Sequence, residues 1–280
     1  MVMRFMKELL SLDEIRNLGE YADQGIKVST HTFDVLKLSL EDMKWEYKTF
    51  SEAKKRVEFF ALTVGITIHD VSKGTIRSTD SEYSHSQIMM KKPEFVQEET
   101  EKILDKLEKK LGVRIKKHIR DNIIHIVLSH HGQWGKVQPN TKEAYIVHRA
   151  DMTSAKYHRI NPIGADKILK LLVEGKSEAE IAEELGCTPG IIRNRLSRAK
   201  GQLKFRTTSQ LIAYYKEHKN VPIGDKVFIQ RVKETDKLKK TVDETGFETL
   251  MIENPLLAYM VDKEIFEKPE QESKEESIEA

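Results

Sequence analysis

Apolar residues recur at helical spacing through the first 160 positions of this chain. In 29–43, Phe33, Leu36, Leu40 and Met43 follow one another every three or four residues, which predicts a helix with Ser29 or Thr30 as its N-cap. Equivalent patterns predict helices over 92–112, 115–132 and 141–159, and Gly112 and Gly132 are the expected ends of the first two. This part of the chain is therefore predicted to be all-α.

The segment 51–70 has a charged first half and a fully apolar second half. We interpret it as one helix that begins at a Ser51 cap and runs from solvent into the core. The second half is rich in β-branched residues, so a strand is the alternative.

The turn-forming residues of 160–166, "INPIGAD", separate this region from three shorter predicted helices. These helices fall in 166–175, 177–186 and 188–203. After His218 the pattern weakens, and 221–252 fits a strand, a helix and a strand, or a hairpin with a helical insert. The last residues are acidic, polar and free of aromatic side chains, which predicts disorder. The predicted parts are a domain over 1–159, a second domain over 160–218, a dimerisation or docking segment over 219–266, and a disordered tail over 267–280.

Composition narrows the function classes only a little. The 280 residues are 39% hydrophobic and 33% charged, and 47 basic against 45 acidic residues leave a net charge of +2. Bulk charge therefore indicates no partner, and any nucleic-acid argument depends on local clusters. The single cysteine, Cys187, excludes a disulfide framework and a thiolate-rich zinc site, and it favours a cytoplasmic location. The N-terminus does not look like a signal peptide, and no apolar run reaches the ~18 residues of a membrane span.

Histidines and aspartates gather at the predicted helix ends. His69 and Asp70 are adjacent at the end of the apolar segment "ITIHD". Adjacent helical residues point about 100° apart, so both can reach one metal ion only where the helix ends. The other residues near predicted helix ends are His31, His85, His130 and Asp151. Imidazoles and carboxylates brought together from several helices are typical ligands of a divalent metal.

With these residues in this order, the segment 29–159 resembles the HD-domain metal-dependent phosphohydrolase superfamily, an all-helical fold with the signature His … His-Asp … Asp. The resemblance implies His31, His69, Asp70 and Asp151 as metal ligands. It also implies a second metal bound by His85 and His130, with Asp70 as the bridge. The stretch "VLSHHGQWG" is similar to the HD domain of certain bacterial 3′–5′ exoribonucleases. The resemblance implies one or two divalent ions, with Mn, Fe, Ni, Co, Zn and Mg as the candidates.

Four further residues are candidates for substrate contacts. Lys73 follows Asp70 by three positions and is expected to neutralise a phosphate oxygen in the transition state. Arg77 and Arg149 are candidates for binding other phosphate groups of the substrate. His131 is a candidate for a contact to the substrate or to the metal ligands. The alternative for Lys73 is a solvated lysine past a helix end. His125, on the apolar face of its helix, is interpreted as a hydrogen-bonded core histidine.

The segment 163–218 has the pattern of a helix-turn-helix. A short amphipathic helix with Ile181, Ala182 and Leu185 inward is followed by Gly186, which permits a sharp turn. Thr188 and Pro189 then suit the start of a second helix. The segment from Ile191 to Arg206, which covers most of that helix and its end, has six basic residues and no acid, as expected where a helix enters the major groove.

This segment resembles the LuxR-type helix-turn-helix domain, and sigma-factor region-four helices share much of the pattern. Gly190 and Asp166 depart from the usual LuxR type. The candidate DNA-binding residues are Arg193, Asn194, Arg195, Arg198 and Lys200. The resemblance also implies a homodimer. A helical module that packs or dimerises without touching DNA is the alternative.

Two functions follow from the combination. In the first, a metal-dependent phosphohydrolase (a phosphodiesterase, nuclease or nucleotidase) acts on a nucleotide or nucleic-acid phosphoester and is coupled to a DNA-binding module. In the second, the chain is a transcription regulator whose HD domain senses a nucleotide ligand with little or no catalysis. A purely structural metal is a third, non-catalytic alternative.

Overall fold

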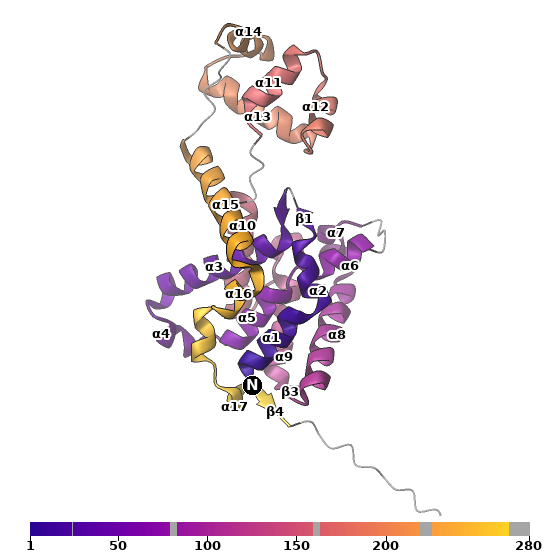
Figure 1. Cartoon of the computed structure of the whole chain (residues 1–280), viewed down its shortest axis with the longest axis vertical. Coiled ribbons are helices and arrows are strands. Elements are labelled where there is room, and N and C mark those ends of the chain that lie inside the picture. The colour runs from indigo at the N-terminus through magenta and orange to yellow at the C-terminus, as the bar shows by residue number, and fades with distance from the viewer. Residues whose placement is uncertain (24, 79–82, 159–162, 219–225, 269–280) are drawn as a thin grey trace, which may run out of the picture. The chain divides into compact units, whose positions relative to one another are not determined.

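The computed structural model describes residues 1–23, 25–78, 83–158, 163–218 and 226–268, with the backbone alone for 76–78, 226–229 and 263. Its contacts divide the chain into two units. The first consists of Met1–Lys156 and Leu238–Ala280, and the second of Tyr157–Lys237. The second unit is therefore inserted in the sequence of the first. The predicted all-α class is confirmed, since almost every element in Figure 1 is a helix.

The helices of the first unit that precede this insertion are α1 (Val2–Ser11), α2 (Asp13–Arg16), α3 (Val28–Tyr47), α4 (Phe50–Lys54), α5 (Phe59–Ile68), α6 (Ser72–Ser78), α7 (His85–Lys91), α8 (Pro93–Leu111), α9 (Lys117–Ser129) and α10 (Lys142–Tyr157). Two 3-10 helices, η1 (Asn17–Gly19) and η2 (Gly132–Trp134), lie between them. The strands of this unit form two short antiparallel pairs. β1 (Ala22–Asp23) pairs with β2 (Ile26–Lys27), and β3 (Arg114–Ile115) pairs with β4 (Phe266–Glu267).

The predicted single helix over 51–70 is wrong, because the structure has two helices there. Thr49, and not Ser51, caps α4 by accepting a hydrogen bond from the Glu52 amide. Glu58 has extended backbone angles and its carboxylate accepts from the Phe60 amide, so it starts α5 as a new helix. All ten residues of α5 are buried. A helix buried on every side has no polar face, which explains why its sequence also fitted a strand.

Of the other predicted helix ends, the structure confirms that of α8 and corrects the start of α3 and the end of α9. α8 ends at Gly112 with a left-handed backbone (φ 63°), as predicted. α3 begins at Val28, so Ser29 and Thr30 lie within the helix and do not cap it. α9 ends two residues earlier than predicted: its last residue is Ser129, and His130, not Gly132, is the C-cap. These shifts place both His31 and His130 at helix termini.

The packing of α5 on α9 determines where the ends of both helices lie. Gly65 allows the close approach, since a Cβ there would stand 2.7 Å from Cγ2 of Ile126. Four residues further along each helix, the rings of His69 and His130 lie 5.1 Å apart. The two helices therefore run in the same direction and end side by side. This brings two predicted ligands together from distant positions in the sequence.

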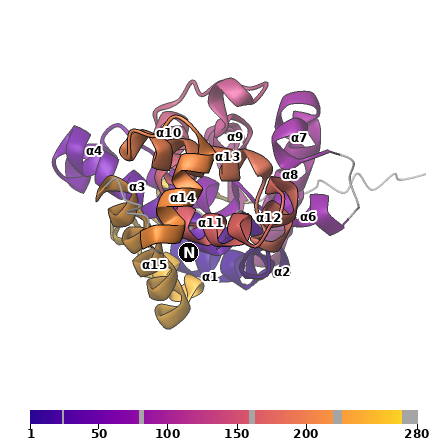
Figure 2. The same ribbon diagram turned by 90° about the horizontal axis from the view of Figure 1, so that it is seen from above.

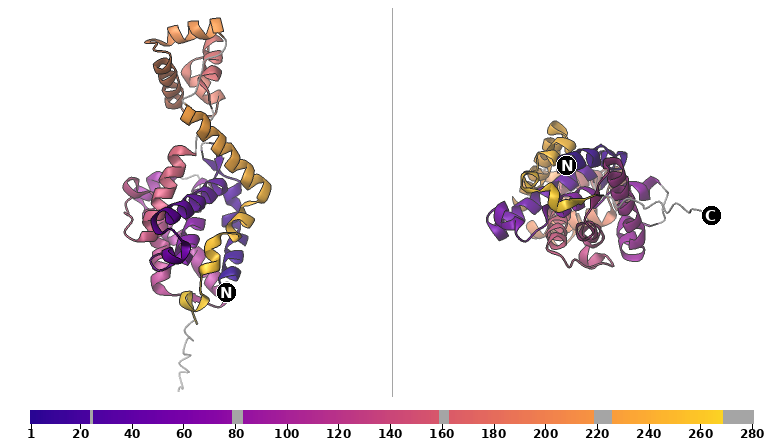
Figure 3. Two further views of the ribbon diagram at one scale, coloured as in Figure 1. Left: turned by 90° about the vertical axis from the view of Figure 1, so that its left-hand side faces the viewer. Right: turned by 90° about the horizontal axis from the view of Figure 1, so that it is seen from below.

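The C-terminal part of the chain returns to the first unit. It contains α15 (Lys226–Thr245), α16 (Phe247–Ile252), η3 (Pro255–Tyr259), α17 (Asp262–Ile265) and β4. Figure 3 shows this yellow segment beside the indigo N-terminal helix, and α16 contacts both α1 and α3. Met251, Leu256 and Ile265 are buried in the same core as α1 to α10. The strand and hairpin predictions are wrong for 226–252, where α15 buries Thr235, Leu238 and Val242 along one face and α16 follows. Residues 221–225 of that prediction lie outside the described residues.

The second unit has its own core. Its helices α11 (Ala165–Val173), α12 (Glu178–Glu184), α13 (Pro189–Gln202) and α14 (Thr208–His218) are seen together in Figure 2. Ile168, Ile181, Ile192, Leu196 and Leu211 form the centre of that core. Ser177 and Glu180 make a reciprocal capping box at the start of α12. In the described ranges, no helix has the length and apolarity needed to cross a bilayer.

Candidate metal centre and nucleic-acid interface

Two histidines follow the last residues of α5 and α9 in the same way. The Nδ1 atom of His69 lies 2.7 Å from the carbonyl oxygen of Ile66, and that of His130 lies 2.6 Å from the carbonyl of Val127. A carbonyl only accepts, so in each ring Nδ1–H donates and Nε2 keeps its lone pair. Both rings are fully buried. The local helix end thus fixes the tautomer that a metal ligand requires.

The first group of ligand atoms consists of His31, His69 and Asp151. Their ligand atoms all lie within 4.8 Å of one another, and all three side chains are buried. Nε2 of His31 is 2.9 Å from Oδ1 of Asp151 and 3.4 Å from Nε2 of His69. The three residues come from α3, the end of α5, and α10.

The second group consists of His85, His130 and His131, whose ligand atoms also lie within 4.8 Å of one another. His85 is the first residue of α7, where Ser84 forms a capping box with Gln87. The structure therefore places His131, predicted as a substrate contact, among the nitrogen atoms that can bind a metal. The sequence feature that could have indicated this role is the adjacent pair His130 and His131 at a predicted helix end. Two adjacent side chains can converge there, as those of His69 and Asp70 do.

Asp70 lies between the two groups. Its Oδ2 atom is 3.5 Å from Nε2 of both His31 and His69. Its Oδ1 atom is 3.4 Å from Nε2 of His85 and 3.7 Å from Nε2 of His130. Each carboxylate oxygen thus faces a different group, which is the arrangement of a bridging ligand.

Burial and charge set the protonation states of these residues. Burial lowers the pKa of His69 to about 4 and that of His131 to about 3, and it holds the pKa of His85 well below its usual value. Burial by itself raises the pKa of Asp70, but Lys73 and the neighbouring histidines outweigh it and hold the pKa well below the usual range. Near neutral pH, these imidazoles are neutral and the carboxylate is ionised, as metal binding requires.

The donor set fits a divalent metal. Nε2 of His85 and Nε2 of His130 are buried and have no hydrogen-bond partner among the described residues. A buried nitrogen left in this way is costly unless something binds it. Imidazole nitrogens and carboxylate oxygens suit the transition metals from Mn²⁺ to Zn²⁺. The residues present can hold one ion in each group.

The other predicted substrate contacts divide into three cases. Lys73 is 11% exposed, and its Nζ atom lies 2.6 Å from Oδ2 of Asp70 and 3.9 Å from Asp23. Arg149 lies two positions before Asp151 on α10, about 200° around the helix, and its guanidinium pairs with Asp42 and Glu46. The structure therefore does not bring Arg149 to the cluster. Arg77 belongs to α6, and its side chain lies outside the described residues.

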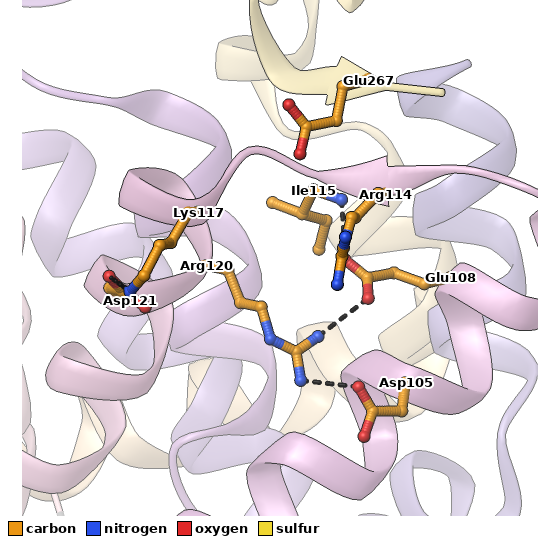
Figure 4. Close-up of a pocket in the computed structure, with 8 residues that line it drawn as sticks. All are labelled: Asp105, Glu108, Arg114, Ile115, Lys117, Arg120, Asp121 and Glu267. Atoms are coloured by element: carbon orange, nitrogen blue, oxygen red, sulfur yellow. Dashed lines mark hydrogen bonds and ion pairs between the residues drawn. The ribbon is translucent and has the colours of Figure 1, made fainter. Parts of the chain in front are cut away.

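A pocket of about 400 Å³ lies elsewhere on the first unit, at the junction of α8, β3, α9 and β4 (Figure 4). Within it, Arg120 donates to Asp105 and Glu108, and Glu108 also accepts from the Ile115 amide. These bonds tie β3 and α9 to α8. The pocket has a structural role and shares no residue with the histidine groups.

In the second unit, the predicted DNA-binding residues lie on α13. Arg193, Asn194 and Arg198 are exposed, whereas Arg195 and Lys200 are half-buried. Burial, together with neighbouring Arg198, lowers the pKa of Arg195. Thr188 precedes α13 but its side chain makes no capping bond, and Pro189 is the first helical residue. The exposed residues on α13 are those best placed to reach a nucleic acid.

The structure thus combines an all-α unit that carries two groups able to hold a metal with a unit that has the helices of a helix-turn-helix. In agreement, residues 28–156 match the HD domain family and residues 166–203 match sigma-70 region 4. The first unit is therefore similar to HD domains over 28–156, and the second is similar to a region-4 helix-turn-helix over 166–203. The match is to region 4, and the LuxR type stays a prediction.

One curated relative is dihydroneopterin 2',3'-cyclic phosphate phosphodiesterase from Methanocaldococcus jannaschii. It is 28% identical over 132 residues, which is 46% of this chain and 47% of the relative. The match therefore spans about half the length of that protein. No solved structure gives a significant match to the chain.

Proposed function

We propose that the first unit is a phosphohydrolase that uses two divalent metal ions to cleave a phosphoester of a nucleotide-type substrate. His31, His69 and Asp151 would hold one ion, His85, His130 and His131 the other, and Asp70 would bridge them. The observation that carries the proposal is the position of Asp70, with one oxygen 3.5 Å from His31 and the other 3.4 Å from His85.

Divalent ions in such a site supply Lewis acidity, which lowers the pKa of a bound water and offsets the negative charge of the phosphate. The protein's own residues supply the rest. His69 and His130 are held in one tautomer by backbone carbonyls, so their rings do not have to reorganise when a ligand binds. Burial excludes bulk water from the centre and strengthens every charge interaction there.

Lys73 is the residue that we assign to the phosphate. Its ammonium group lies at the edge of the centre, bonded to Asp70 and close to Asp23. A cation in this position can stabilise a phosphate oxygen as charge develops in the transition state. Lys73 therefore has two roles: it neutralises Asp70 in the absence of metal, and it contacts the phosphate when substrate is present.

The relative and the HD domain match support a proposal for the substrate class. The relative's name contains a 2',3'-cyclic phosphate, so we place cyclic phosphodiesters of nucleotides first among the candidate substrates. The experiment is a phosphoester panel of cyclic nucleotides, cyclic dinucleotides, nucleotides, RNA and DNA, assayed with Mn²⁺. We expect hydrolysis of at least one diester by the wild type and at least a 100-fold loss in Asp70→Asn. Equal rates in the two proteins would remove the catalytic assignment.

For the second unit, we propose DNA binding through α13. The match to sigma-70 region 4 and the exposed Arg193, Asn194 and Arg198 support it. In helix-turn-helix proteins the second helix enters the major groove and its polar side chains contact phosphates and base edges. The LuxR type and the homodimer remain part of this proposal.

A second candidate function is a transcription regulator that senses a nucleotide. The observation that favours it is that α10 carries Asp151 and ends at Tyr157, the first residue of the second unit. A nucleotide that shifts DNA affinity without being consumed would support this function over the hydrolase. Measuring DNA affinity with and without the best ligand from the panel decides between them.

A further inference from the structure

Three polar residues occupy one face of α10. His148, Asp151 and Ser154 follow one another at three-residue spacing, which places them along one side of a helix. Asp151 belongs to the first histidine group. His148 and Ser154 belong to neither group, yet each contacts a residue of one of them.

Ser154 contacts His31 of the first group at Nδ1, on the side of the ring away from the other ligand atoms. Its Oγ atom lies 2.9 Å from Nδ1 of His31, and its side chain is 1% exposed. The opposite nitrogen of the same ring, Nε2, is the one that lies 2.9 Å from Asp151. A carboxylate only accepts, so without metal Nε2–H donates to Asp151 and Nδ1 can accept from the Ser154 hydroxyl. With a metal at Nε2, the ring proton would be on Nδ1 and would be donated to Ser154 Oγ. The hydroxyl can therefore hold the ring orientation in both states.

His148 contacts the second group through its backbone. Its Nδ1 atom lies 2.7 Å from the carbonyl oxygen of His130, so Nδ1–H donates to that carbonyl. The ring also covers Gly132, where φ is +51° and a Cβ would come within 2.2 Å of the His148 ring. Any side chain at this position would displace His148. The turn from His130 to Gly132 is therefore held between the last turn of α9 and the ring of His148.

We propose that Ser154 and His148 are positioning residues, each for a different half of the metal centre. Ser154 orients His31 in the first group, and His148 fixes the turn that presents His130 and His131 in the second. The inference rests on the proposed function, since it requires that both groups bind metal. Because both residues lie on α10, this helix would align the two histidine groups with each other.

The test measures Mn²⁺ affinity of the full chain by calorimetry after removal of metal with a chelator. Two backgrounds isolate the halves: Asp151→Asn weakens the first group, and His85→Gln weakens the second. In the His85→Gln background we expect Ser154→Ala to lower the remaining affinity by about 10- to 100-fold, which is typical when the partner of a metal-binding histidine is lost. In the Asp151→Asn background the same change should alter affinity by less than about 3-fold.

His148→Leu keeps most of the side-chain volume and loses the N–H donor. We expect it to lower Mn²⁺ affinity in the Asp151→Asn background and to have little effect in the His85→Gln background. Conservative variants separate positioning from packing. Ser154→Thr keeps a hydroxyl, and His148→Asn keeps an N–H donor near the position of Nδ1, so both should restore affinity to within about 3-fold. Arg149→Ala is the matched control on the same helix, because its side chain pairs with Asp42 away from the centre. If His148→Leu does not fold, His148→Ala takes its place.

Equal losses in both backgrounds, or no loss in either, would overturn the positioning roles while leaving the metal centre intact. Failure of the conservative variants to restore affinity would also overturn them. A wild-type chain that takes up no Mn²⁺ would overturn the proposed function and this inference together. The two failures are therefore distinguished by the wild-type titration alone.

Discussion

At the level of single residues, the candidate metal centre depends on the side chains that follow the last residues of α5 and α9. His69 and His130 both donate Nδ1–H to the carbonyl three residues earlier. Past the last helical turn, adjacent side chains are no longer held about 100° apart. Asp70 can therefore approach Nε2 of His69, and His131 can approach His130. Adjacent His and Asp residues at a helix end were visible in the sequence, so His69 and Asp70 were predictable.

Other features of the centre were not predictable from the sequence. His131 was assigned to substrate because nothing in the sequence indicates which of two adjacent histidines faces a third. Arg149, a candidate for a phosphate contact, is two residues from Asp151. On a helix this spacing directs the Arg149 side chain away from that of Asp151. Its ion pairs with Asp42 and Glu46, which only the structure shows, hold it away from the centre.

Lys73 gives a prediction about the metal-free protein. Lys73→Met leaves the buried Asp70 carboxylate without its cation, and we expect a loss of about 3 kcal/mol or more in the free energy of unfolding. For a unit of this size, this lowers the melting temperature by roughly 6 °C or more. Added Mn²⁺ should recover most of the loss, because its charge replaces that of Lys73. The measurement is a thermal melt with chelator and with Mn²⁺.

The control for this change is Lys102→Met. Lys102 also pairs with an acid three residues away, Glu99, but its side chain is 70% exposed. Exposed pairs contribute about 1 kcal/mol or less, so the melting temperature should hardly move. If Lys73→Met melted like Lys102→Met, the ion pair in the centre would have no energetic role.

The buried histidines predict acid sensitivity of the metal-free protein. The pKa of His69 is about 4 and that of His131 about 3 when folded, against about 6.5 in the unfolded chain. Below about pH 6.5 the unfolded chain therefore binds protons that the folded chain does not, so the free energy of unfolding falls as pH falls. Each histidine contributes a slope of up to about 1.4 kcal/mol per pH unit.

Urea unfolding at a series of pH values between 7.5 and 4.5, in the presence of chelator, measures this slope. The carboxylates Asp70 and Asp151 have lowered pKa values and act in the same direction at lower pH. His69→Gln should show a shallower decline than the wild type. A stability that stays flat from pH 7 to 4.5 would contradict the burial of neutral histidines.

At the level of elements, α13 shows where the sequence was sufficient and where it was not. Its position, its Pro189 start and its basic character were all predicted. Burial of single positions was not, because it depends on the helices that pack against α13. Arg195, one of the five candidate DNA-binding residues, is half-buried.

We expect Arg193→Ala and Arg198→Ala each to weaken binding to duplex DNA and to reduce the salt slope of log Kd by about 1. Arg195→Ala should act mainly through the stability of the second unit. Fluorescence anisotropy over a range of salt concentrations measures the slope. Lys170→Ala, an exposed charge on α11, is the control and should leave the slope unchanged. A slope that is the same for Arg198→Ala and Lys170→Ala would exclude α13 as the interface.

At the level of the whole molecule, the first unit is built from two separate stretches of sequence. The helical content of 1–159 could be predicted from its periodic apolar residues. The return of the C-terminal segment could not, because Met251, Leu256 and Ile265 are too widely spaced to form a pattern of their own. Their role becomes visible only when they are packed against α1, α3 and α5.

This arrangement predicts that a chain ending at Thr245 will not fold its first unit stably. Burying one large apolar side chain contributes about 1.5–3 kcal/mol, so losing three removes about 5 kcal/mol or more. That is comparable to the whole stability of a typical domain. The predicted tail began at Glu267, but Glu267 belongs to β4 and pairs with Arg114. Circular dichroism melts therefore compare the shorter chain with one ending at Lys268, which lacks only 269–280 and should melt like the full chain. Equal melting of all three chains would contradict the role of the C-terminal segment.

The central claim is that Asp70 bridges two metal ions. Anomalous diffraction from crystals grown with Mn²⁺ tests it most directly, because it locates each ion independently of activity. We predict two anomalous peaks, each about 2 Å from a different oxygen of Asp70. One peak should be shared with His31, His69 and Asp151, and the other with His85, His130 and His131. Manganese bound elsewhere, with no peak beside Asp70, would contradict the account.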